Sequence, residues 1–227
     1  MKAMDAIAVL KKDHSEVERL FVRFERTRSA PERRRLAERI VRELSIHAAV
    51  EEQLVYPRLR GRLDGAEGEV LLALEEHHFT KVALSEIEAL PAESERLAPK
   101  VRVLAENVRR HVQEEERQLL PALKRLVTAE ELLELGDALL AAKRLAPTRP
   151  HPTAPDEPPG NVLTTPAAAV YDRGRDALSR GLELVVERGR GVVDRALRRG
   201  EQAARSARQR IGRGLEQAGR EVRTTSH

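Results

Sequence analysis

The stretch HAAVEEQLVYP occupies residues 47–57, and HVQEEERQLLP occupies residues 111–121. Each stretch begins with a His, has a Glu four residues later and reaches a Pro ten residues after the His. A spacing of four places two side chains on the same face of an α-helix. Both stretches therefore predict a helix with an imidazole and a carboxylate on one face.

The faces that hold these pairs are otherwise apolar. Leu36, Ile40 and Leu44 precede His47 at helical spacing, and Val101, Leu104 and Val108 precede His111. Apolar residues three and four apart predict amphipathic helices over 31–59 and 100–127. Similar stripes predict helices over 5–27 and 66–90, each with one His in its stripe, His14 and His77. Capping-box patterns, Ser29 with Glu32 and Thr128 with Glu131, predict helix starts, the second opening a short fifth helix.

Four helices of about 25 residues with short connections are typical of an all-α, up-down-up-down four-helix bundle. The composition agrees, because Leu, Ala, Arg and Glu dominate and aromatic residues make up only 2% of the chain. The chain has no Cys, which excludes disulfides, cysteine-bound zinc and thiol nucleophiles. It also has neither a signal peptide pattern nor a run of about 20 apolar residues. We therefore expect a cytoplasmic protein without a transmembrane segment.

The His residues follow an internal repeat. His14 and His77 are 63 residues apart, and His47 and His111 are 64 apart, so two similar helical hairpins are expected. Antiparallel packing would bring six polar side chains to one level of the apolar interior. They are His14, His47, Glu51, His77, His111 and Glu115. Because burial of unpartnered polar groups is costly, these six residues predict a shared partner, and metal ions are the natural one.

The donor types restrict the metal. Four imidazoles and two carboxylates suit Fe, Mn, Zn, Ni or Cu better than Ca or Mg, which prefer oxygen ligands. Six ligands exceed one tetrahedral site and fit two ions side by side, with carboxylates able to bridge. Two divalent ions and two carboxylates leave a charge that a bridging oxo or hydroxo group would offset.

Four segments, DHSEVERLF, HAAVEEQLVYP, EEHHFTKVALSEIEAL and HVQEEERQLLP, resemble the signature segments of hemerythrin-like (HHE cation-binding) domains. The resemblance covers about residues 5–145, with all four segments in order. It implies a four-helix bundle with a non-haem di-iron centre that reacts with O2 or related small molecules, while the donor types leave Mn or Zn as alternatives to iron. Carried over, the metal ligands would be the six residues given above, with Glu51 and Glu115 as the bridging carboxylates.

The sequence departs from oxygen-carrying hemerythrins at one ligand. These proteins add a fifth His one turn from the one on the third helix, where this chain has Ala73 and Lys81. His78 points about 100° away from His77 and is a poor substitute. The departure argues against reversible O2 carriage and favours sensing of O2 or NO, peroxide turnover or iron handling.

Several neighbours of these ligands are also candidates for lesser roles. The acidic ones are Glu52, Glu75, Glu76, Glu114 and Glu116. We expect most of them to face solvent and one or two to support a ligating His. Tyr56 is expected to pack rather than take part in chemistry, and Pro57 and Pro121 to end or kink their helices. His151 and His227 are assigned no role.

The sequence changes character after the fifth helix. We expect a metal-binding domain over residues 1–146, a Pro-rich linker over 147–166 and an Arg-rich amphipathic helical or partly disordered tail over 167–227. Residues 148–227 hold 15 Arg, no Lys and 10 acidic residues, a net charge of +5. Such a tail could contact an anionic membrane surface, nucleic acid or another helix, and its sequence does not choose among them.

Three functions remain open at this point. The protein binds or senses O2, NO or peroxide at a non-haem di-iron centre, or it is a di-iron redox enzyme acting on peroxide or NO. Alternatively it is an interaction protein whose metal site is only structural. The sequence shows no GxGxxG, P-loop or HExxH motif that would indicate another chemistry.

Overall fold

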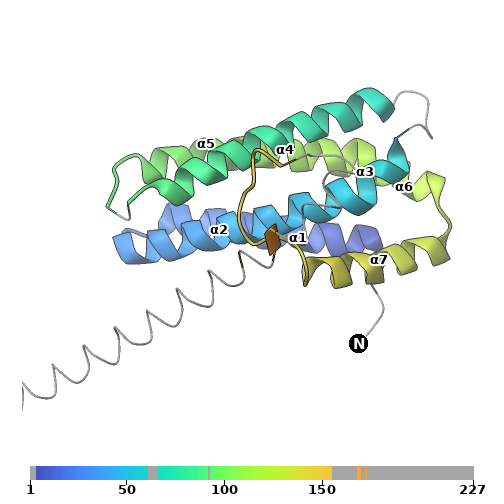
Figure 1. Ribbon diagram of the computed structural model, residues 1–227, viewed down its shortest axis with the longest axis horizontal. Helices are drawn as coiled ribbons and strands as arrows, with labels where there is room; N and C mark the ends of the chain where they lie inside the picture. The colour runs from blue at the N-terminus through green and yellow to red at the C-terminus, as the bar shows by residue number, and fades with distance from the viewer. Residues whose placement is uncertain (1–3, 61–65, 92, 155–167, 170–171, 173–227) are drawn as a thin grey trace, which may run out of the picture. The chain divides into compact units, whose positions relative to one another are not determined.

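The computed structural model describes residues 4–60, 66–91, 93–154, 168–169 and 172. These residues form an all-helical bundle and include no strand. The four long rods are α1 (Ala6–Arg26), α2 (Ala30–Val50), α4 (Ala66–Ala89) and α5 (Leu97–Glu114), as Figure 1 shows. The up-down-up-down bundle predicted from the sequence is confirmed.

Two of the predicted helices contain a π-helical turn. After α2 comes η1 (Glu51–Val55) and then α3 (Tyr56–Leu59); after α5 comes η2 (Glu115–Leu119) and then α6 (Leu120–Leu126). In each turn the backbone N–H of the residue before the Pro bonds five residues back, Tyr56 to Glu51 and Leu120 to Glu115. Pro57 and Pro121 thus do not end the rods. The wider turn precedes each Pro, whose ring lacks an N–H and crowds the carbonyl four residues back.

The fifth helix, α7 (Ala129–Lys143), packs along α1 and α2 beside the four rods (Figure 1). Its predicted capping box between Thr128 and Glu131 is present in full. The box predicted at Ser29 is only half formed. The Ser29 hydroxyl accepts from Glu32 N–H, but the Glu32 carboxylate pairs instead with Arg23 at 2.9 Å.

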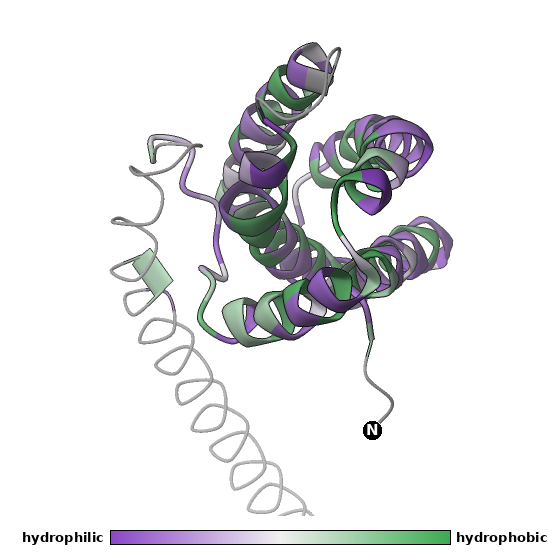
Figure 2. Cartoon of the chain, turned by 90° about the vertical axis from the view of Figure 1, so that its right-hand side faces the viewer, coloured by the Kyte–Doolittle hydropathy of each residue, from purple (hydrophilic) through white to green (hydrophobic). Residues whose placement is uncertain are grey.

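Each helix carries hydrophobic and hydrophilic residues in alternating bands (Figure 2), and the buried hydrophobic residues make up the core. They form two separate core clusters. One cluster includes Leu10, Val50 and Leu119, and the other includes Val17, Leu44 and Val108. Along α1, His14 lies between Leu10 and Val17, so the two clusters leave a polar layer between them.

The linker predicted for residues 147–166 is described only to residue 154, a stretch without a helix. The tail predicted for 167–227 lies outside the described residues, apart from positions 168, 169 and 172. Among the described helices, none is both long enough and apolar enough to cross a membrane.

Candidate metal centre

The polar layer between the two core clusters contains all six residues singled out in the sequence. Each of the four long helices contributes one His, and the two Glu stand at the first position of η1 and η2. All six are buried, with exposed fractions between 0% for Glu51 and 8% for His111. The structure thus brings together every residue that the sequence proposed as a ligand.

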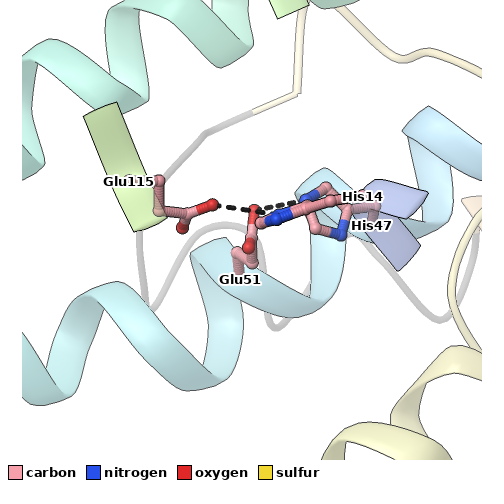
Figure 3. Close-up of side chains that lie close together, drawn as sticks. All are labelled: His14, His47, Glu51 and Glu115. Carbon is pink, nitrogen blue, oxygen red and sulfur yellow. Dashed lines mark ion pairs between the residues drawn. The ribbon is translucent and has the colours of Figure 1, made fainter. Parts of the chain in front are cut away.

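The six side chains form two groups whose nitrogen and oxygen atoms lie within 4.8 Å of one another. The first group is His14, His47, Glu51 and Glu115, drawn in Figure 3; the second is Glu51, His77 and His111. Glu51 belongs to both groups. Its Oε2 lies 3.1 Å from His47 Nε2 and 3.4 Å from His77 Nε2. A carboxylate in this position could bridge two ions.

Several inner atoms of this layer lack a hydrogen-bond partner among the described residues. They are Nε2 of His14 and His47, both carboxylate oxygens of Glu51, and Oε2 of Glu115. A buried polar atom left without a partner costs about 1–3 kcal/mol, and more when it is charged. Convergence of several such atoms is unfavourable unless a common partner binds them. Their chemistry, imidazole nitrogen and carboxylate oxygen, fits first-row transition metal ions.

The opposite ring nitrogens face a second set of carboxylates. The Nδ1–oxygen distances are 2.9 Å for His14 with Glu116, 3.7 Å for His47 with Asp13, 3.0 Å for His77 with Glu52 and 2.8 Å for His111 with Glu76. A carboxylate hydrogen-bonded to Nδ1 fixes the ring orientation and favours the tautomer whose Nε2 lone pair is free for a metal. This holds for His14, His77 and His111, whereas Asp13 stands beyond hydrogen-bond distance of His47 Nδ1.

Each carboxylate of this second set has a basic partner. Lys11 lies 3.2 Å from Glu116, Lys81 2.7 Å from Glu52 and Arg110 3.2 Å from Glu76, while Lys143 pairs with Asp13. The arrangement repeats four times around the bundle as imidazole, carboxylate and cation. Hydrogen bonding to His111, together with the nearby charge of Arg110, lowers the pKa of Glu76 despite its partial burial.

These supporting carboxylates have a simple place in the sequence. Each one is the immediate neighbour of a candidate ligand, and each faces the His of an adjacent helix. Asp13 precedes His14 and faces His47; Glu52 follows Glu51 and faces His77. Adjacent residues on a helix differ by about 100° in direction, so the neighbour of an inward ligand turns towards the next helix.

Only part of this second set was predicted from the sequence. Glu52, Glu76 and Glu116 were among five acidic neighbours of which one or two were expected to support a His, and Asp13 was not predicted. The DH, EE and EH pairs in the four segments are the signal that identifies all four positions.

Tyr56 packs in a core cluster, as expected, but its hydroxyl also reaches the polar layer, which was not expected. Its side chain is 1% exposed, and its hydroxyl lies 3.2 Å from His77 Nε2 and 3.4 Å from Glu115 Oε1. The π-helical turn explains this placement, because the extra residue returns the fifth residue after Glu51 to the same side. The corresponding residue of the second repeat is Leu120, so the two repeats, as far as the structure describes them, place a phenol at one side of the centre and an aliphatic side chain at the other.

Charge and burial shift the site's pKa values in different directions. Burial lowers the pKa of His77 to about 3, and the charge of His111 acts in the same sense. For His47 burial also lowers the pKa, but Glu51 and Asp13 outweigh it and raise the pKa well above 6.5. Burial and the charges of Glu115 and Glu51 raise the pKa of Tyr56 well above 10. Tyr56 therefore retains its proton at neutral pH in the metal-free site.

The position of the fifth His of oxygen carriers is filled differently here. Lys81, one turn after His77, directs its ammonium group to Glu52 rather than to the centre. Ala73 is buried in a core cluster. His78 belongs to neither ligand group. The second group thus has three candidate ligands where the first has four, with the Tyr56 hydroxyl beside it.

A small cavity adjoins the four imidazoles. It holds about 20 Å³, the space of roughly one water molecule. Apart from the four His and Thr80, its lining is apolar: Val17, Leu44, Ala48, Val108 and Val112. The centre therefore has an apolar side suited to a small neutral molecule and a polar side formed by Glu51, Glu115 and Tyr56.

Comparison with known proteins places this geometry in a family. The chain is 28% identical over 171 residues to an uncharacterised hemerythrin-like protein of Schizosaccharomyces pombe. The matched region covers 74% of this chain and 84% of that protein. It is 28% identical over 135 residues to a DNA nickase of a Nostoc species, covering 60% of this chain but only 38% of the nickase.

A solved structure agrees with these sequence matches. The crystal structure of a hemerythrin HHE cation binding domain-containing protein from Mycobacterium kansasii matches with a TM-score of 0.54 and 28% identity, over 62% of this chain and 86% of that one. The model of the hemerythrin HHE cation binding domain matches residues 5–123, more than half of the chain. The chain therefore belongs to the hemerythrin HHE cation-binding family.

Proposed function

We propose that the six buried residues hold two iron ions and that the protein binds or senses O2, NO or peroxide at this pair. The observation that supports this most strongly is the convergence of unpartnered buried nitrogen and oxygen atoms in two groups that share Glu51. The first group has four candidate ligands and the second has three, numbers that suit one ion each. Imidazole and carboxylate donors suit iron, Zn and Mn alike, and iron is proposed among them because the family resemblance implies it.

When bound, the iron ions would provide redox chemistry and coordination positions open to a small ligand. The protein would determine which ligands reach them. The cavity beside the imidazoles holds about 20 Å³, so it would admit only a very small molecule. Its lining of Val17, Leu44 and Val108 favours uncharged molecules, since a charged one would lose its hydration there. The protein's part is thus to orient the imidazoles through their carboxylates and to limit access by water.

A second candidate, redox turnover of peroxide or NO, is favoured by Tyr56. Its phenol O–H stands 3.2 Å from His77 Nε2 and is held protonated by burial. Such a group could donate a hydrogen bond or a proton to a ligand beside the second group of residues. The corresponding Leu120 has no polar group, which makes the two sides of the centre chemically different.

Ligand titration of the iron-loaded full chain tests these proposals. Binding or sensing predicts a reversible optical change with O2, NO or azide and no consumption of ligand beyond stoichiometry. Redox turnover predicts continued loss of peroxide or NO that is abolished in His47→Ala. Stable metal occupancy with no response to any of these molecules would contradict both and leave a purely structural metal site.

A further inference from the structure

The contact between α4 and α5–η2 has two adjoining surface pockets that reach the centre. The larger, about 300 Å³, is bordered by Glu75, Glu76, Arg110 and His111. The smaller is bordered by Glu69, Glu76, Glu114, Glu115 and His111. Glu76 and His111 are common to both, and His111 also borders the small inner cavity. We call Glu69, Glu75, Glu76 and Glu114 the acidic mouth.

The acidic mouth has an excess of negative charge. Its basic residue is Arg110, which pairs with Glu76 at 3.2 Å. No basic side chain of the described residues forms an ion pair with Glu69, Glu75 or Glu114. Carboxylates gathered at the rim of a cleft attract cations and raise their local concentration, and they repel anions.

Glu115 connects the mouth with the buried layer. Its carboxylate is 1% exposed, and it both borders the smaller pocket and belongs to the first candidate ligand group. Its Oε2 lies 3.2 Å from His14 Nε2 and accepts no hydrogen bond. His111, at 8%, is also the most exposed of the six ligand candidates. An ion that reaches Glu76 and His111 would therefore find a buried carboxylate, Glu115, bordering the same pocket.

The other supporting carboxylates are shielded by lysines. Lys11 stands over Glu116 between α1 and η2, Lys143 over Asp13 beside α7, and Lys81 over Glu52 between η1 and α4. An approaching metal cation would be repelled by an ammonium group at each of these places. At the acidic mouth, three further carboxylates offset the one guanidinium.

We infer that the divalent metal cation enters the centre between α4 and α5–η2, drawn by the acidic mouth and handed past Glu76 and His111 to Glu115. The inference rests on the proposed metal centre, but it concerns how fast metal arrives rather than whether it binds. Oxygen donors such as carboxylates suit a partly hydrated divalent ion, which makes the mouth a transit site rather than a closed ligand cage.

Metal uptake by the metal-free full chain tests the inference. Mixing with Co²⁺ in a stopped-flow instrument would follow loading through the visible absorption of the bound ion, without any activity assay. The test variant is Glu69→Gln/Glu75→Gln/Glu114→Gln. The control is Glu130→Gln/Glu134→Gln/Asp137→Asn, which removes the same charge from exposed positions on α7. Neither triple variant changes a candidate ligand.

Steering by charge predicts that the mouth variant loads about tenfold more slowly at low ionic strength and reaches the same final metal content. The difference should shrink to about twofold or less in about 0.5 M salt, because screening removes it. An unchanged loading rate with normal final occupancy would overturn the entry route while leaving the metal centre intact. Equal slowing by the α7 control would overturn it as well. Failure of the unaltered chain to bind any metal would overturn the proposed function and this inference together.

Discussion

Glu52 and Glu116 each contact the Nδ1 atom of a candidate His ligand from equivalent positions of the repeat, but their surroundings differ. Glu52 faces His77, and its side chain is 3% exposed; Glu116 faces His14, and its side chain is 32% exposed. Their cations differ likewise, since Lys81 is 11% exposed and Lys11 50%. Replacement of either Glu by Gln removes the charge that orients one His and retains the size of the side chain.

The two replacements should cost stability unequally. Glu52→Gln breaks a buried ion pair whose Lys remains inside, a change that typically costs about 3–5 kcal/mol of unfolding free energy. Glu116→Gln breaks a partly solvated pair, for which about 0–1 kcal/mol is expected. Because both remove the carboxylate behind a candidate ligand, both should weaken binding of the adjacent ion about 10–100-fold.

Urea unfolding of the metal-free proteins measures the first effect, and competition with a chelator for Co²⁺ measures the second. The double variant Glu52→Gln/Lys81→Met removes both buried charges, so it should recover most of the lost stability without recovering metal affinity. Equal stability costs for the two single variants, or metal affinities unchanged in both, would refute the reasoning.

Three other predictions follow from particular contacts. Tyr56→Phe should retain metal content but alter the optical spectrum and the response to peroxide, because the hydroxyl 3.2 Å from His77 is lost; identical spectra and rates would argue against a role for the phenol. In the metal-free protein the pKa of His77 is lowered to about 3, so its contribution to the free energy of unfolding is full above about pH 6.5 and falls as the pH drops towards about 3. Between these values His77 contributes a slope of about 1.4 kcal/mol per pH unit. This contribution should vanish in His77→Gln, which urea unfolding between pH 6 and 4 would measure. Gly136→Ala should destabilise the bundle by about 1–3 kcal/mol because its Cβ would stand 2.1 Å from the Met4 carbonyl oxygen, whereas Gly68→Ala, with nothing within 4 Å, should be neutral or stabilising in thermal unfolding.

The fold and the six converging residues were predictable because their signals are local and periodic. Each of the four helices has one His near the middle of its apolar face. Helical spacing and antiparallel packing are enough to bring these four His residues together. The helix start predicted at Thr128 was confirmed for the same reason, because its capping box involves neighbouring residues alone. At Ser29 the prediction was half right because Glu32 found a competing partner, Arg23, on another helix.

The π-helical turns and their consequences could not be predicted in the same way. The Pro residues indicated a disturbance, but whether a helix kinks, ends or widens depends on packing around it. That choice determines where Tyr56 points, so its position beside His77 was missed. The supporting carboxylates were only partly recognised, because an acidic neighbour of a ligand reads equally well as a solvent-facing residue until the adjacent helix is in place.

Metal content of the full chain, purified under anaerobic conditions in the presence of iron and then exposed to air, tests the central proposal most directly. Two ligand groups sharing Glu51 predict about two irons per chain and a ferric charge-transfer band that appears in air. A protein that holds no metal, or one filled with zinc and unchanged by air, would contradict the di-iron centre and every ligand reaction proposed for it.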